Sequence, residues 1–319
     1  MASPMHARRA KLKSQLVSAK AKLKHHVTPR RLLLLSAAAA SAFLLLLTLR
    51  TLSAAAANTS SPAPVVVHRS QQQQWDEQCD RVPAGVAEAL VHYATSNATA
   101  SAWGRRRRSA EEVAATARAV SRRAPCNLLV FGLGHGAALW AALNHGGRTV
   151  FLEEDDALVS GASPASLAIE AYRVAYLASA ADADELLALR DSEHCTGAAT
   201  QQLSPGHFDR SPCKLAVRGL PAAFYEAEWD VIVVDAHAPP PPTTTAMMGA
   251  IYTAAVAARA RRPAAETETE TDVVVHDVDL PVQDRFSTAF LCGGYLKEEV
   301  GNLRRFAIPS HKEGMPFCP

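Results

Sequence analysis

The sequence predicts an α/β domain with a mostly parallel sheet and a Rossmann-like nucleoside-binding half. Short apolar runs of strand length alternate with segments of helical periodicity between residues 127 and 275, a pattern typical of a parallel sheet covered by helices. A glycine-rich turn, GLGHG at residues 132–136, follows the first run, and the acidic run EED at residues 153–155 ends the second. An acidic residue about 20 positions after such a turn is typical of a fold that binds a ribose.

The predicted elements alternate along the chain. Apolar residues at helical spacing predict helices, and short apolar runs bounded by glycine, proline or polar residues predict strands. Helices are predicted at residues 82–93, 111–123, 137–143 and 247–260. Strands are predicted at residues 127–131, 149–152, 171–176, 230–234 and 273–275. Loops are predicted at residues 192–212 and 266–272, and the basic run at residues 105–108 is interpreted as a solvated surface.

The N-terminal part of the chain predicts a membrane anchor. Residues 1–31 contain nine Lys and Arg and no acidic residue, and residues 32–49 form an uncharged run of 18, close to the shortest helix that crosses a bilayer. The positive-inside bias predicts a basic cytosolic tail at 1–31, a transmembrane signal anchor at 32–49, a flexible stalk at 50–78 and a lumenal domain at 79–319. A cleaved signal peptide is the alternative, because small residues follow at 53–57.

The charge and the cysteines restrict the class of protein further. Residues 76–319 carry 22 Lys and Arg against 31 Asp and Glu, a net charge of −9, which argues against a nucleic-acid partner. All six cysteines lie beyond the predicted anchor, where an oxidising lumen permits up to three disulfides. Cys195 and Cys213 bracket a loop and are predicted to pair, whereas Cys126, next to a predicted strand, is interpreted as a packed free thiol.

Three polar residues follow two of the predicted strands. Asp235 comes after the strand at 230–234, and His276 and Asp277 come after the strand at 273–275. Because ligands bind at the carboxyl ends of parallel strands, we expect these catalytic candidates to converge there. A carboxylate with a histidine suits general-base catalysis; alternatively, Asp235 and Asp277 bind a divalent metal ion. A third interpretation is that His276 or Asp277 only caps the next element.

Several sequence blocks follow one another in order along the chain. They are PCNLLVFGLGH at 125–135, LNHGGRTVFLEED at 143–155, CKLA at 213–216, GLP at 219–221, FY at 224–225, WD at 229–230, DA at 235–236, IYTAAV at 251–256, VHDV at 275–278, FLC at 290–292 and FAIP at 306–309. Together these blocks resemble the glucuronoxylan 4-O-methyltransferase family, which includes the related irregular-xylem proteins needed for xylan deposition. The similarity extends from about Cys79 to the C-terminus, and the EED block and the AIP ending are closer to the methyltransferase branch.

The resemblance implies a Rossmann-like S-adenosylmethionine-dependent methyltransferase fold with S-adenosylmethionine as cofactor. It implies that the turn containing Gly132, Gly134 and Gly136 borders the amino acid part of the cofactor, and that Glu153 or Glu154 holds its ribose. The implied reaction methylates the 4-hydroxyl of glucuronic acid side chains of glucuronoxylan, a step in plant cell-wall biosynthesis.

Such a reaction needs alignment of the sugar hydroxyl with the methyl group and removal of the hydroxyl proton. Asp235, His276 and Asp277 are the candidates for that proton transfer, directly or through the metal ion. The resemblance also implies a single-pass type II protein of the Golgi membrane with a lumenal catalytic domain. The expected partners are glucuronic-acid-bearing xylan or a related polysaccharide, the Golgi membrane through one helix, and xylan-synthesis enzymes.

The loop after Asp235 departs from the family pattern. The family usually continues after Asp-Ala with Pro, Lys or Arg, Gly and Tyr, and later Pro-Gly-Arg-Met, whereas residues 237–248 here read HAPPPPTTTAMM. Met247 stands in place of the arginine, so two basic residues that would suit an anionic sugar are absent. Three hypotheses follow: a sugar-acid O-methyltransferase, a non-catalytic or differently specific member supporting xylan biosynthesis, and an unrelated nucleotide-sugar or NAD enzyme.

Overall fold

The computed structural model describes residues 81–96, 108–134, 136–162, 169–177, 182–197, 203–235, 245–262, 270–311 and 315–318. All of these residues belong to the unit Arg69–Pro319. The predicted tail, anchor and stalk, Cys79, His135 and the loop at 236–244 lie outside the described residues. Within the described part of the chain, no helix is both long and apolar enough to cross a bilayer.

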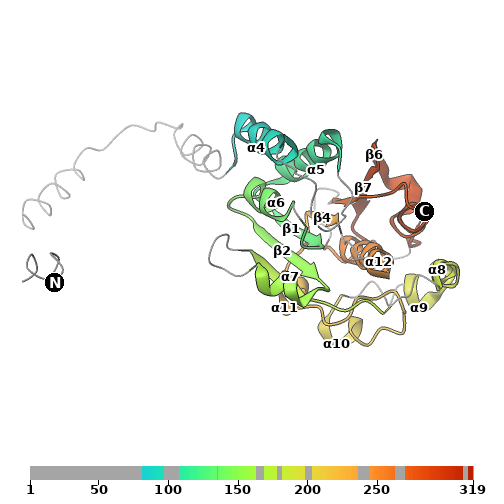
Figure 1. Ribbon diagram of the computed structural model, residues 1–319. Coiled ribbons are helices and arrows are strands. Elements are labelled where there is room, and N and C mark those ends of the chain that lie inside the picture. The colour runs from blue at the N-terminus through green and yellow to red at the C-terminus, as the bar shows by residue number, and fades with distance from the viewer. Residues whose placement is uncertain are drawn as a thin grey trace, which may run out of the picture. The chain divides into compact units, whose positions relative to one another are not determined.

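Helices and strands alternate as the sequence predicts (Figure 1). The longer helices are α4 (Ala84–Ser96), α5 (Ala110–Arg123), α6 (Ala137–Leu143) and α12 (Thr245–Arg259). The shorter ones are α7 (Asp156–Gly161), α8 (Ala183–Leu187), α9 (Glu193–Thr196), α10 (Pro205–Phe208), α11 (Ala222–Glu226) and α13 (Pro281–Phe286), with irregular turns η2 (Ala188–Asp191), η4 (Ser287–Cys292) and η5 (Gly293–Tyr295). The strands are β1 (Asn127–Phe131), β2 (Arg148–Glu153), β3 (Glu170–Arg173), β4 (Val231–Val234), β5 (Glu270–Val275), β6 (Leu296–Val300) and β7 (Leu303–Pro309).

The strands form one sheet in the order β3-β2-β1-β4-β5-β7-β6. Strands β1 to β5 pair with one another in parallel, and β7 is antiparallel to both β5 and β6. The prediction of a mostly parallel α/β sheet is therefore confirmed. The strand order reverses between β1 and β4, and open sheets of this kind bind ligands beside that switch point, at the carboxyl ends of the strands.

Alternate residues of the central strands enter two separate apolar cores. Leu129 and Phe131 of β1 lie in the core that contains the apolar side chains of α12 and α13. Leu128 and Val130 lie in the core formed with α5 and α6. Figure 1 shows α4, α5 and α6 on one side of the sheet and α12 on the other. Burial on both faces explains why these strands are continuous apolar runs in the sequence.

Two predictions about loops are wrong. The end of the acidic segment at 266–272 belongs to β5, and Asp272 is only 4% exposed. Arg305 donates to Asp272 at 2.7 Å and Arg123 at 3.2 Å, so two guanidinium groups make burial of this carboxylate tolerable. The loop at 192–212 contains the short helices α9 and α10.

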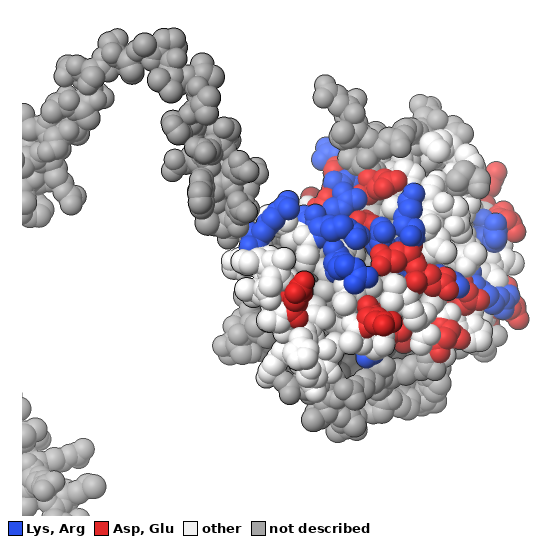
Figure 2. Space-filling model, turned by 90° about the horizontal axis from the view of Figure 1, so that it is seen from above, with Lys and Arg blue, Asp and Glu red and all other residues white. Residues whose placement is uncertain are grey.

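The β6–β7 hairpin and α13 were not predicted. Strand β6, with the sequence LKEEV, is largely exposed at the edge of the sheet, and charged edge strands have no clear apolar pattern. Arg118 of α5 and Arg305 of β7 both contact Glu298 of β6. Figure 2, seen from the side on which α4 and α5 lie in Figure 1, shows Lys and Arg gathered beside Asp and Glu.

The cysteine predictions agree with the structure. Cys195 and Cys213 form a disulfide, as predicted from the loop between them. A second disulfide joins Cys292 to Cys318, which sequence alone did not select. Cys126 is a buried free thiol, and burial, followed by the charge of nearby Asp230, raises its pKa to about 12.

Candidate active site

The strand register brings three of the predicted site residues to one edge of the sheet. The backbone N–H of Gly132 donates to the carbonyl of Leu152 at 2.8 Å, and the N–H of Asp235 donates to Phe131 at 2.8 Å. The N–H of His276 donates to the carbonyl of Val234 at 3.2 Å. The backbones at positions 132, 235 and 276 therefore extend the ladder side by side just beyond β1, β4 and β5. Of the three catalytic candidates, the backbones of Asp235 and His276 thus lie on neighbouring strands, while the convergence of their side chains with that of Asp277 on a ligand stays a prediction.

Two positions in the glycine turn at 132–136 require glycine, each for a different physical reason. Gly132 has φ of 105°, in the left-handed region where a side chain is disfavoured. Gly136 immediately precedes α6, and a Cβ added there would lie 2.6 Å from Nε1 of Trp140. Gly134 is partly exposed between them. The indole of Trp140 is 1% exposed and, among the described residues, its N–H has no hydrogen-bond partner. Sequence reasoning missed Trp140, although its spacing of four from Gly136 on a helix places them together.

The three acidic residues at the end of β2, Glu153, Glu154 and Asp155, have different contacts. The buried carboxylate of Glu153 accepts from the N–H groups of Leu133, Glu154 and Asp155 at 2.7, 2.8 and 3.0 Å. Glu153 thereby ties the glycine turn to the end of β2, with about one of four acceptor positions left over. Asp155 caps α7 by accepting from Ala157 at 2.8 Å.

Glu154 is exposed, like Asp155, and a partly buried tyrosine, Tyr176, lies near it. Partial burial raises the pKa of Glu154, with a further contribution from the charge of Glu153. Burial is also the main cause of the raised pKa of Tyr176, followed by the charges of Glu153 and Glu154. Within the described part of the chain the Tyr176 hydroxyl has no hydrogen-bond partner. The tyrosine follows β3 and also lies against Gly249 of α12, where an added Cβ would approach its ring to 3.0 Å.

Asp235 is 2% exposed and forms an ion pair with Arg108. The Arg108 side chain is 14% exposed, so the interpretation of the 105–108 run as solvated is wrong for this residue. The other three arginines lie outside the described residues. A guanidinium next to Asp235 opposes binding of a second cation there. The described residues contain no group of three or more His, Cys, Asp or Glu that could hold a metal ion. The metal site at Asp235 and Asp277 stays a prediction, and the charge of Arg108 argues against it.

His276 is held by α5. Its Nε2 lies 3.1 Å from the hydroxyl of Thr116, and that hydroxyl lies 3.2 Å from the carbonyl of Glu112. A threonine has a single O–H, and donation to the Glu112 carbonyl leaves its oxygen to accept from Nε2–H of His276. His276 is 1% exposed, and this arrangement limits any role as a base to Nδ1.

Asp277 has left-handed backbone geometry. Its φ is 58°, uncommon for a residue other than glycine, and its carbonyl accepts from Leu280 at 3.0 Å. The next residue, Val278, donates to the carbonyl of Asn302 in the β6–β7 turn at 3.0 Å. The backbone of Asp277 therefore shapes the turn after β5, whereas the N-cap of the next helix, α13, is Leu280. A catalytic role for the Asp277 side chain stays a prediction.

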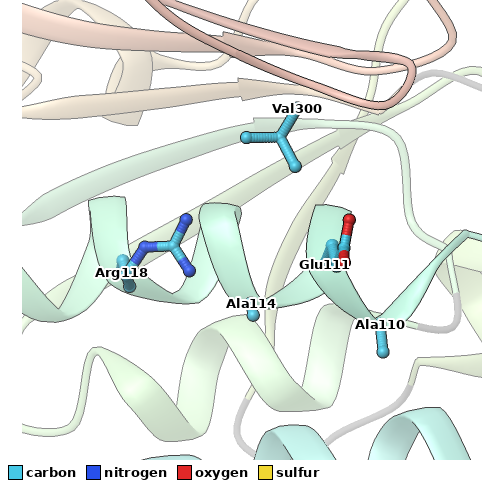
Figure 3. A pocket seen from close by; sticks show the side chains of 5 residues that line it. All are labelled: Ala110, Glu111, Ala114, Arg118 and Val300. Carbon is cyan, nitrogen blue, oxygen red and sulfur yellow. The ribbon is translucent and has the colours of Figure 1, made fainter.

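Three surface cavities lie near the described helices. One of about 550 Å³ is lined by Arg108, by Ser109 and Ala110, and by three residues of α4 (His92, Thr95 and Ser96). A second, of about 460 Å³, lies at the amino end of β2, away from the predicted site. The third, of about 370 Å³, runs along α5, and Figure 3 shows Glu111 and Arg118 on this helix with Val300 of β6 across from it. Only the first of these three includes a residue that contacts Asp235.

The sheet order, the glycine turn and the acids at one carboxyl edge define a Rossmann-like α/β protein. Residues 111–306 match the family described as IRX15/IRX15L/GXM, and the chain belongs to this family. It is 43% identical to glucuronoxylan 4-O-methyltransferase 2 of Arabidopsis thaliana over 245 residues, 76% of this chain and 79% of the relative. It is 36% identical to arabinogalactan O-methyltransferase 2 of the same plant over 236 residues, 72% of this chain and 77% of the relative.

A solved structure, that of the SAH-bound Podospora anserina methyltransferase PaMTH1, is also similar. The similarity covers 79% of this chain and 100% of the other, with a TM-score of 0.37 and 10% sequence identity. The assignment to the family rests on the 111–306 match and on the curated relatives.

Proposed function

We propose that this protein is an S-adenosylmethionine-dependent O-methyltransferase that methylates the 4-hydroxyl of glucuronic acid side chains of glucuronoxylan. The observation that carries the proposal is the 43% identity to a glucuronoxylan 4-O-methyltransferase over 245 residues. The matched segment includes the glycine turn, Glu153 and Asp235, whose positions at the carboxyl edge of the sheet suit a nucleoside ligand.

The residues at this edge fit the proposed cofactor. The left-handed turn at Gly132 permits close approach of a ligand to the backbone. The exposed carboxylate of Glu154, or the remaining acceptor position of Glu153, can accept from a ribose diol. When bound, S-adenosylmethionine supplies an electrophilic methyl group on a sulfonium.

The protein's own contribution is alignment and proton transfer. The oxygen of the acceptor hydroxyl forms a bond to the methyl carbon while the carbon–sulfur bond breaks and its electrons remain on sulfur. The hydroxyl proton passes to Asp235, which Arg108 holds in position. Loss of a general base typically costs 10²–10⁴-fold in rate, so Asp235→Asn should lower methyl transfer by about that factor.

The test is methyl transfer by the fragment 79–319 to glucuronoxylan oligosaccharides, with the methylated position determined by NMR. Methylation at O4 supports the proposal. Cofactor binding without transfer to any glucuronic-acid-bearing glycan would instead favour a non-catalytic role in xylan biosynthesis, the second candidate, which the altered loop at 236–247 motivates. Calorimetric binding of NAD but not S-adenosylmethionine would exclude both.

We also propose that residues 32–49 anchor the protein in the Golgi membrane as a single-pass type II protein with a lumenal domain, where xylan-synthesis enzymes are expected partners. The basic residues at 1–31 support this orientation, and the two disulfides support an oxidising compartment. Protease protection of the C-terminus in sealed microsomes tests the orientation. An N-terminus found at residue 50 or beyond in the mature protein would show that the segment is cleaved.

A further inference from the structure

We propose that Arg108 binds the carboxylate of the acceptor sugar acid and thereby selects the adjacent hydroxyl for reaction at Asp235. This inference rests on the proposed function and adds a specificity residue to it. Arg108 lies before the segment at 111–306 that matches the family, so the match itself assigns it no role.

Arg108 connects the surface to the buried edge of the sheet. Its guanidinium pairs with Asp235, whose side chain is 1% exposed, and the same residue lines the cavity of about 550 Å³ beside α4. A guanidinium carries five N–H donors in a planar fork. One arginine can therefore contact two carboxylates, one provided by the protein and one by a ligand that enters from the cavity.

The chemistry of a uronic acid fits this arrangement. In glucuronic acid the carboxylate is attached to C5, so the 4-hydroxyl is on the neighbouring ring carbon. A guanidinium shared between the sugar carboxylate and Asp235 places that hydroxyl next to the proposed base. The same geometry disfavours reaction at O2 or O3, which are farther from the carboxylate along the ring.

The surroundings of Arg108 suit a carbohydrate with a negative charge. The same cavity is lined by the polar residues His92, Thr95 and Ser96 of α4, whose side chains can hydrogen-bond to sugar hydroxyls. Residues 76–319 have a net charge of −9, which repels a polyanion in general. Figure 2 nevertheless shows Lys and Arg gathered on the face seen from the side of α4 and α5.

The altered loop after Asp235 makes a basic residue elsewhere, such as Arg108, necessary for binding an anionic acceptor. Residues 236–247 contain no Lys or Arg, where the family pattern has two basic positions. An anionic acceptor bound near Asp235 therefore needs a basic residue from another part of the chain to balance its charge. Among the described residues, Arg108 is the basic side chain whose ion pair with Asp235 is observed directly.

The test measures acceptor binding separately from turnover. Fragment 79–319 is titrated by calorimetry with a glucuronic-acid-substituted xylo-oligosaccharide and with the same compound after reduction of its carboxyl group to an alcohol. The wild type is expected to prefer the acid by about 10- to 100-fold, as for a charge-assisted hydrogen-bonded pair. Arg108→Ala should abolish this preference while leaving the affinity for S-adenosylmethionine unchanged. Arg118→Ala, in α5 and 54% exposed, is the matched control and should retain the preference.

Arg108→Ala leaves Asp235 buried without its partner and can destabilise the fold. The double variant Arg108→Ala/Asp235→Asn removes both charges and gives a second binding measurement in a folded protein. An undiminished preference for the acid in either variant overturns the proposal. Absence of methyl transfer by a wild type that still shows the Arg108-dependent preference contradicts the proposed catalytic function but not the binding role.

Discussion

Glu112 joins the start of α5 to the β6–β7 turn, and its removal provides a sharp test of how the site is held. One carboxylate oxygen accepts from the N–H of Ser109 at 2.9 Å, and the other accepts from the N–H of Asn302 at 2.7 Å. The hydroxyl of Ser109 accepts in return from the N–H of Glu112 at 3.1 Å, which completes a capping box. The Glu112 residue is only 7% exposed.

The expected loss of stability follows from these contacts. Each of the two hydrogen bonds to this charged group contributes about 1.5–3 kcal/mol, so Glu112→Ala should lower the free energy of unfolding by about 3–6 kcal/mol. For a domain of this size, each kcal/mol corresponds to about 2–4 °C in Tm. Glu112→Gln retains one acceptor oxygen and should give an intermediate loss. Guanidinium denaturation of fragment 79–319, monitored by circular dichroism, measures the free energy of unfolding of both variants.

Glu111→Ala is the matched control, because Glu111 is exposed in the same first turn of α5. It removes the same charge from the helix N-terminus and should cost only about 0.3–1 kcal/mol. The reasoning is refuted if Glu112→Ala destabilises the fragment no more than Glu111→Ala does. In that case the carboxylate does not connect α5 to the hairpin in solution.

Three further predictions follow from individual contacts. Gly136→Ala should destabilise the fold by about 1–3 kcal/mol, because the new Cβ would lie 2.6 Å from Nε1 of Trp140; thermal unfolding measures this. The Cys126 thiol, whose pKa burial raises to about 12, should have about one thousandth of its molecules ionised at pH 9, so peptide mapping should find almost no alkylation in the native protein. Glu170→Gln should lower stability at pH 7 by up to about 1 kcal/mol, and this effect should diminish as acidification protonates Glu170. The hydrogen bond from Arg148 lowers the pKa of Glu170, so its contribution is present above the unfolded pKa and is lost as the pH falls through the folded one.

Each of these has its own control. Gly161→Ala, at a position with no heavy atom within 4 Å of the added Cβ, should leave stability nearly unchanged. Rapid alkylation of Cys126 in denaturant must accompany its protection in the folded state; rapid native alkylation contradicts the burial argument. Glu226, 65% exposed and 3.9 Å from Arg148, is the control for Glu170, and an equal pH dependence for Glu226→Gln would contradict the assigned role of the 2.8 Å contact.

Much of the central sheet could be predicted from local pattern. The residues of β1 and α6 were predicted at their observed bounds, and β2, β4 and α12 within a few residues, because buried apolar runs bounded by turn residues have few other conformations. The turn at Gly132 and the acids at 153–155 were identified for the same reason. β6, by contrast, is a charged edge strand whose pairing depends on β7, and no local pattern marks it.

The local sequence pattern did not predict the tertiary contacts of individual charged side chains. Asp272 was assigned to a surface loop because its neighbours are acidic, yet two distant arginines pair with it inside β5. Arg108 was assigned to solvent because it ends a basic run, yet it pairs with Asp235, 127 positions away in the sequence. Whether a charge is solvated depends on which opposite charge the fold brings near it.

By itself, the sequence determined the α/β class, the central strands and the turn at Gly132. It also suggested the Cys195–Cys213 pairing, and its resemblance pointed to the family. These features depend on residues close together in the chain or on blocks that can be compared directly. Only the tertiary structure decided the order of the sheet, the use of Glu153 as a backbone acceptor and the position of Arg108 beside Asp235. Those outcomes depend on strand order and register, which bring together groups whose separation along the chain carries no information about their distance in space.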